Sequence, residues 1–339
     1  MSKRRNGIAL VLGLLLVWGA GGPASGRPSG DEDSPEPVGG RPGPAIEVGV
    51  EPSWVAIRNL DLDYAFVDES GNLGGGGIVR TLGYDRDSAL RYSLAWRFAK
   101  PGSPTLHVDF WELEAEGDSS TGLFPSNVGA LLASPILALG GQASDSATAS
   151  SEIQATQGDV YLTWRPRLGD RMTMEVAAGI RGYRFEEATA VIYAGDGLEE
   201  RITIQGDAKG LGPRTSVAFE YEPTRRLRCS ARLGLALPVG EVERFLSDVE
   251  FQTNPLTPVG SVVVNREGDR RATTQLEGGL RIEWWPIRRL LVTFGYEYMV
   301  WSDVRVDLRL TDVVSPSAAA PSEHDAVFEG PSLGLRYTF

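Results

Sequence analysis

Charged side chains recur at alternate positions through much of this sequence. In ALRYSLAWRF, Arg91 and Arg97 alternate with large apolar residues. Charges that converge on one lumen could form a constriction that selects passing ions or anionic solutes. They could equally pair with one another across neighbouring strands and fill a narrow interior. The residues that share this pattern, and that we predict to line a lumen, are Arg91, Arg97, Arg165, Glu175, Arg181, Arg214, Glu220, Arg228, Arg232, Glu277, Arg281, Glu283, Glu297 and Arg336.

The two histidines are the next candidates for chemistry. His107 shares a face with Asp109 if that stretch is extended, and His324 lies between Glu323 and Asp325. A carboxylate can orient a histidine base while another activates water, but solvated loop or lumen residues look the same in a sequence. No serine stands in a nucleophile-elbow context, and no Cys/His cluster has zinc-site spacing. The sequence therefore predicts no enzyme, no metal site and no cofactor.

The charged positions belong to stretches in which apolar and polar residues alternate. An apolar face with a period of two residues indicates a β-strand. Each stretch has about the length of a tilted strand that crosses a membrane. These predicted strands are ALRYSLAWRF, GDVYLTWR, PRTSVAFEY, LRCSARLGLAL, QLEGGLRIEW and LLVTFGYEY.

Short and long connections alternate between the predicted strands. The short ones, AKPGSP, RPRLGD, EPTRR and WPIRR, are each followed by a long one, at about 115–155, 187–204, 241–271 and 303–324. Short turns on one side and long loops on the other are typical of an up-and-down membrane barrel. Counting from a first strand near 46–66, we predict an all-β, transmembrane, antiparallel β-barrel of about 10 strands, with 8 or 12 as alternatives.

The N-terminal residues indicate export. Basic residues precede an apolar stretch at 8–17, and small residues follow it, so we predict a signal peptide at 1–26. Residues 27–44 are rich in Pro, Gly and acid and are expected to be a disordered linker, which leaves 45–339 for the barrel. Cys229 is the sole cysteine, so no intrachain disulfide can form. The net charge of −12 argues against a nucleic-acid partner.

The chain ends in an alternating strand whose last residue is aromatic. Leu335, Tyr337 and Phe339 share one apolar face. A terminal aromatic residue of this kind resembles the signal that barrel-assembly machinery reads on outer-membrane proteins. We therefore predict that the apolar faces meet outer-membrane lipid and the charged faces line the lumen. This location requires a Gram-negative bacterium.

Several stretches together resemble the outer-membrane barrels related to the Legionella major outer membrane protein. They are LDYAFVD, AAGIRGYRF, GLGPRTSVAFEY, FGYEYMVW and FEGPSLGLRYTF, spread from the first strand to the last. The resemblance implies a porin-like barrel at the cell surface and brings no catalytic signature.

Two functions follow as hypotheses. A porin-like barrel would pass small solutes or ions through a narrow charged lumen. A non-conducting structural or adhesive barrel would act through its long extracellular loops, and the apolar segment 128–141 could cap the mouth, plug the lumen or bind a surface. The porin-like function is the prediction. Solute selectivity, loop partners and oligomeric state do not follow from the sequence.

Overall fold

The computed structural model describes residues 45–60, 62–67, 78–84, 86–98, 102–121, 128–130, 143–195, 197–253, 256–306 and 323–339. The predicted signal peptide, the linker and most of the apolar segment 128–141 lie outside these residues. Among the residues described, no helix is long and apolar enough to cross a bilayer.

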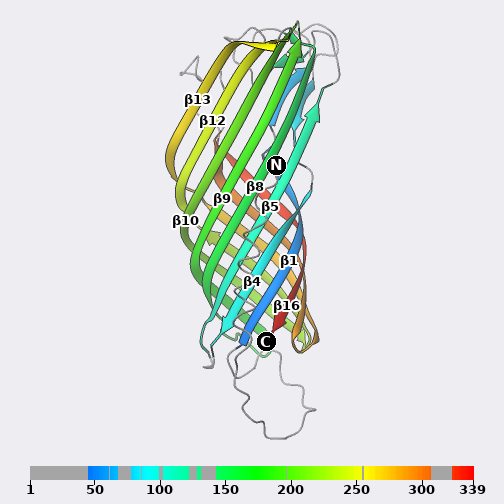
Figure 1. Cartoon of the computed structure of the whole chain (residues 1–339). Coiled ribbons are helices and arrows are strands. Elements are labelled where there is room, and N and C mark those ends of the chain that lie inside the picture. The colour runs from blue at the N-terminus through cyan, green and yellow to red at the C-terminus, as the bar shows by residue number, and fades with distance from the viewer. Residues whose placement is uncertain are drawn as a thin grey trace. The chain divides into compact units, whose positions relative to one another are not determined.

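Ten strands close into one antiparallel ring (Figure 1). In ring order they are β1 (Ala45–Arg58), β4 (Asp87–Arg97), β5 (Thr105–Ser120), β8 (Ser146–Trp164), β9 (Met172–Gly195), β10 (Leu198–Thr224), β11 (Leu227–Ala236), β14 (Gln275–Ile287), β15 (Leu290–Val306) and β16 (Glu323–Thr338). The pairing of β16 with β1 and of β10 with β11 completes the ring. The prediction of a closed antiparallel barrel of ten strands is confirmed.

The first and last strands form the closing seam. Val48 lies opposite Tyr337, and the backbone N–H of Phe339 donates to the carbonyl oxygen of Ile46 over 2.9 Å. The chain therefore enters and leaves the ring at one end, which we call the near end. The short connections β4–β5, β8–β9, β10–β11 and β14–β15 lie at this end as well.

A belt of exposed apolar side chains surrounds the near end. On β9 it runs from Met172 to Ile180, and on β10 from Tyr221 to Leu211. At ~3.3 Å per residue and a tilt of ~40°, the part on β9 is roughly 20–25 Å tall, which is the height of the lipid-facing band of membrane barrels. A closed ring leaves no unpaired backbone edge in this belt, as lipid requires.

Cys229 lies on this belt, between Tyr221 of β10 and Ile282 of β14. Because both neighbours are exposed apolar residues, we expect a membrane-permeant maleimide to label Cys229 in intact membranes and a charged maleimide to leave it unlabelled. A Cys229→Ser, Ser230→Cys variant moves the thiol to the lumen cavity and should lose this preference. Rapid labelling of the natural protein by the charged reagent would reverse the assignment of the two faces.

Above the belt the polarity of the two faces is exchanged, as β5 shows. Its outward residues change from Phe110 to Glu112 and Glu114, while its inward residues change from Asp109 to Trp111. Partial burial and the neighbouring Glu114 carboxylate raise the pKa of Glu112. The exchange marks the level at which the exposed apolar belt ends.

A collar of ion pairs follows the belt on the outward face of β9 and β10. The Arg184 guanidinium lies 2.7 Å from both Glu186 and Asp207, and the hydrogen bond to Asp207 raises the pKa of Arg184. Exposed pairs of this kind contribute little to stability. Their position shows that these strands leave the apolar belt at this height.

Beyond the collar, strands continue where the sequence predicted long loops. β9 ends at Gly195 and β10 begins at Leu198, so 187–204 is almost entirely strand. Likewise, β12 (Val239–Thr253) and β13 (Leu256–Ala272) form a hairpin over 241–271. The predictions of long loops at these two places are wrong. In 187–204 the alternation of apolar and polar residues is weak because outward residues such as Ala188 and Ala190 are small.

The long strand β10 has two successive partners on one side. Its second half pairs with β11, and its first half pairs with β12. Pro238 separates β11 from β12 and cannot donate a backbone hydrogen bond. Because β12 takes the place of β11 beside β10, the strands β5, β8, β9, β10, β12 and β13 lie side by side toward the far end (Figure 1).

A second sheet and an apolar core occupy the interior of the far end. The sheet contains β2 (Leu62–Val67), β3 (Ile78–Leu82), β6 (Val128–Ala130) and β7 (Ala143–Ser144). Leu82 packs with Tyr193, Ile202 and Leu246, and all four side chains are buried. The far half is therefore packed in the same way as a water-soluble protein. The predicted single strand at 46–66 is instead β1 followed by β2.

Candidate functional site

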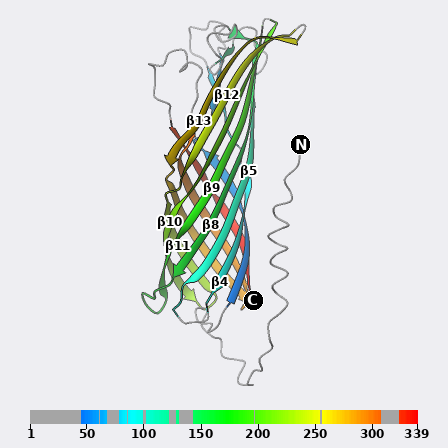
Figure 2. The same cartoon turned by 60° about the vertical axis from the view of Figure 1, so that its left-hand side comes forward.

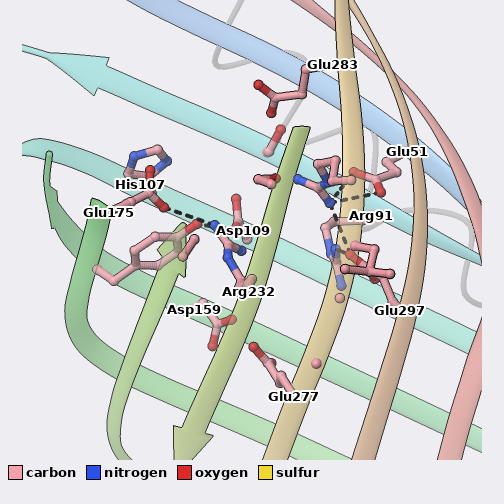
Figure 3. Close-up of a pocket in the computed structure, with 18 of the residues that line it drawn as sticks. Glu51, Arg91, His107, Asp109, Asp159, Glu175, Arg232, Glu277, Glu283 and Glu297 are labelled. Atoms are coloured by element: carbon pink, nitrogen blue, oxygen red, sulfur yellow. Dashed lines mark hydrogen bonds and ion pairs between the residues drawn. The ribbon is translucent and has the colours of Figure 1, made fainter. Parts of the chain in front are cut away.

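The predicted charged residues converge on the lumen at the level of the belt. Most of them line one cavity of about 80 Å³ (Figure 3). Those that line it are Arg91, Arg165, Glu175, Arg214, Glu220, Arg232, Glu277, Arg281, Glu283, Glu297 and Arg336. The other three, Arg97, Arg181 and Arg228, are not among the lining residues of this cavity and pair with carboxylates.

Arg181 is the most deeply buried of these charges, with 1% of its surface exposed. Its Nε and Nη2 donate to the two carboxylate oxygens of Asp159 over 2.7 and 2.8 Å, and its Nη2 also contacts Glu277. Arg214 lies 3.4 Å from Asp159 and 3.3 Å from Glu277, and its guanidinium stacks on Tyr161. Two arginines and two carboxylates thus form a closed network across β8, β9, β10 and β14.

A second group of charges spans the closing seam. Arg91 of β4 lies 2.5 Å from Glu297 of β15, and Arg281 of β14 lies 3.0 Å from Glu51 of β1 and 3.1 Å from Glu297. The hydroxyl of Ser332 on β16 donates to Glu51 over 2.6 Å. Five neighbouring strands are therefore tied together inside the barrel, and Figure 3 shows Glu51, Arg91 and Glu297 of this group.

A third group lies on β9, β10, β11 and β14, together with Arg165, which directly follows β8. Glu175 binds Arg165 at 2.6 Å and Arg232 at 3.1 Å. Arg228 lies 3.6 Å from Glu220 and 3.4 Å from Glu283.

Glu47 holds the last two predicted arginines near the seam. It lies 2.8 Å from Arg97 and 3.8 Å from Arg336. Every arginine of the predicted set therefore has a carboxylate within 4 Å. The charges pair across strands, which is one of the two arrangements that the sequence allowed, and most of the fixed charge is neutralised locally.

An aromatic cluster crosses the lumen on the far side of the cavity. The ring of Trp301 makes edge-on contacts with Trp111, Tyr183 and Phe328 at centroid distances of 5.9, 5.5 and 5.2 Å. These residues come from β15, β5, β9 and β16, on opposite walls of the barrel, and each is at most 6% exposed. The hydroxyl groups of Tyr183 and Thr273 lie 2.7 Å apart. The cluster therefore joins opposite walls across the lumen, above the charged cavity.

The histidines do not form a catalytic arrangement together. His107 stacks on Tyr161 with 4.8 Å between ring centroids, and its Nε2 lies 3.1 Å from the Thr163 hydroxyl. Asp109 accepts a hydrogen bond from the Tyr161 hydroxyl over 2.7 Å. His324 lies at the opposite end of the barrel, at the start of β16. Within the described residues, no group of three or more His, Cys, Asp or Glu side chains could hold a metal ion.

Sequence reasoning missed several residues of the site. Asp159, Tyr161 and Glu51 line the cavity but were absent from the predicted set. Asp159 alternates with Tyr161 along β8, so the same rule of alternation could have found it. Trp111 and Trp301 were missed because large aromatic residues were expected to face lipid.

Comparisons with known proteins identify no family. The sequence matches no family model and no curated protein. Among solved structures, the outer membrane protease OmpT of Escherichia coli is 10% identical with a TM-score of 0.47, covering 87% of this chain and 97% of that chain. The toluene transporter TodX of Pseudomonas putida is 6% identical with a TM-score of 0.31, covering 89% and 91%. Ail of Yersinia pestis is 8% identical with a TM-score of 0.24, covering 86% and 98%.

These values assign no function to the chain. Identities of 10% or less with TM-scores below 0.5 carry neither an enzyme activity nor a transport activity across. None of these findings links the chain to the Legionella major outer membrane protein. The geometry itself supports the broader conclusion: the chain is a closed, ten-stranded antiparallel β-barrel of the outer-membrane type.

Proposed function

We propose that the protein is a non-conducting barrel of the bacterial outer membrane that presents its far end to the outside as a binding platform. The observation that carries this proposal is the aromatic cluster of Trp111, Tyr183, Trp301 and Phe328, whose buried rings pack against one another between opposite walls of the lumen. Ions cannot cross a packed apolar layer without losing their hydration, which is energetically costly.

The charged cavity below the cluster supports the same proposal. Its arginines and carboxylates bind one another, so few fixed charges are free to attract a passing ion. Side chains fill the interior of barrels with about eight strands, whereas water channels have sixteen or more. A ring of ten strands is close in size to the barrels whose interior is filled by side chains.

The location and the platform follow from the outer surface. The apolar belt suits lipid, and its near end, which holds the exposed side chains of Leu335, Tyr337 and Phe339, would face the periplasm. Barrel-assembly machinery would then read these three residues during insertion. The strands that pass the collar would stand outside the membrane, where they replace the predicted long loops as the surface available to a partner.

A porin-like function is the second candidate, because the cavity has both positive and negative lining residues. Purified protein in planar bilayers distinguishes the two. We expect no discrete conductance steps, in the same bilayers in which an open porin conducts. Lipid-side labelling of Cys229 and a heat-dependent shift in gel mobility would show that the silent protein is inserted and folded.

Discrete steps from the natural protein would overturn the proposal and favour the porin. In that case, replacing Arg181, Arg232 or Arg281 with Glu should change the ion selectivity, because fixed charges set the field in a pore. If the ion selectivity of the conductance steps stayed the same in all three variants, the conducting path would lie outside this lumen.

A further inference from the structure

Among the described residues, β13 of the β12–β13 hairpin is the last strand of the extended sheet. β13 pairs with β12 and, in the part of the chain that the structure describes, with no other strand. The two strands run together along one side of the barrel (Figure 2). An edge strand presents backbone N–H and C=O groups with which an incoming strand can pair.

This edge lacks the charges that usually protect an edge strand. The β13 sequence over 256–265 is LTPVGSVVVN, which contains no charged residue. The opposite edge of the same sheet is β5 beyond Leu113, the last residue that pairs with β4. That edge carries the exposed residues Glu114, Glu116 and Asp118. One edge is therefore protected by charge. The described part of the other edge over 259–264 carries no charge, and only Pro258 and the β-bulge beside it limit pairing there.

Both faces of β13 are apolar next to the open edge. The inward residues Val262 and Val264 pack against the far-end core. On the other side Leu256, Val259 and Val263 are 56, 56 and 58% exposed. A strand with apolar residues on both faces is typical of the middle of a covered sheet rather than its margin.

We propose that the 259–264 edge of β13 binds an extended, uncharged segment of a partner protein by strand addition. Backbone pairing would supply the affinity, and alternate β-branched or aromatic residues would continue the two apolar faces. This inference rests on the proposed binding role and names its surface and partner class. A strand satisfies the backbone edge and the exposed valines at the same time.

A second copy in the same membrane does not fit this edge. Two barrels in one membrane are related by a two-fold axis along the membrane normal. Barrel strands tilt by about 35–45° from that normal, so the two β13 strands would cross at roughly twice this angle. Strands that cross so steeply cannot form a ladder of hydrogen bonds.

The test uses the full chain, folded in detergent micelles, and a fluorescent peptide that copies residues 259–265 as the probe. We expect saturable binding by fluorescence anisotropy, with hydrogen-exchange protection gained over 259–264. Val263→Lys should weaken binding by about tenfold or more, because it sets a charge against the apolar face of the added strand. Ile192→Lys is the matched control: it adds the same charge to the outward face of β9, away from the edge, and should leave binding unchanged.

Three results would overturn the proposal. One is a failure of the expected peptide binding, seen either as no binding and no protection or as equal binding by the Val263→Lys variant. Another is self-association of the natural chain in micelles that Val263→Lys abolishes, which would make a second copy the occupant. The third is strong protection of 259–264 in the free protein that disappears when 308–318 is deleted, which would make the chain itself the occupant. Bilayer conductance does not involve β13, so it tests the closed lumen separately.

Discussion

Replacing Arg181 with methionine is expected to lower the free energy of unfolding by about 3–5 kcal/mol, the usual cost of removing one partner from a buried ion pair. Methionine fills much of the same volume but offers no donor to Asp159 or Glu277. Arg214 contacts both carboxylates at 3.3–3.4 Å and can compensate only in part. Guanidinium unfolding in phospholipid vesicles, followed by tryptophan fluorescence, measures the loss.

Two further variants separate the cost of leaving the Asp159 and Glu277 carboxylates unpaired from a general effect of losing an arginine. Arg58→Met removes a pair with Glu329 in which Arg58 is 65% exposed, and it should cost no more than about 1 kcal/mol. Arg181→Met combined with Asp159→Asn should cost less than the sum of the two single changes, because it also removes a carboxylate that would be left unpaired. If Arg181→Met were no more destabilising than Arg58→Met, the network would not hold the barrel wall as described.

Replacing Trp301 with alanine is expected to lower the free energy of unfolding by about 3–5 kcal/mol, the range for removing a buried Trp or Phe side chain. Trp301 has no exposed surface and contacts three other aromatic rings. Its removal would leave a cavity between opposite walls that a rigid barrel cannot collapse to fill. The same vesicle unfolding experiment measures the loss.

Trp301→Phe is the informative control for this prediction. It keeps an apolar ring and removes the indole N–H, which has no partner among the described residues. Because an unsatisfied buried donor is itself costly, the phenylalanine variant should lose much less stability than the alanine variant. Equal losses for the two variants would show that the indole ring is held by something other than packing in this cluster.

The strands of the belt could be predicted from the sequence because their two faces differ in polarity. The outward face is apolar and the inward face is charged, so residues such as Leu233 and Arg232 alternate strictly. The same period predicts that Cys229 faces lipid. Antiparallel pairing through short near-end turns then follows from the length of the connections.

The far-end strands could not be read in this way. There the outward face carries small or polar residues such as Ala188, Ala190 and Gln205. Without an apolar outer face, the two-residue period fades, and strands look like loops. The stretch HVDFWELEAE nevertheless shows where the polarity of the two faces is exchanged. Asp109 is followed by Trp111 on one face, and Phe110 is followed by Glu112 on the other.

The sequence by itself predicted a closed antiparallel barrel of about ten strands, the outward and inward sides of the belt and most of the charges that line the cavity, because each depends on local alternation. Only the tertiary structure decided which charges meet. Arg181 pairs with Glu277, Arg281 with Glu51, and Trp301 with Phe328. These contacts depend on the register of the strands and on which walls face each other across the lumen, and one strand's pattern contains neither. The aromatic contacts across the lumen and, among the described residues, the place of β13 at the margin of the sheet are consequences of that arrangement.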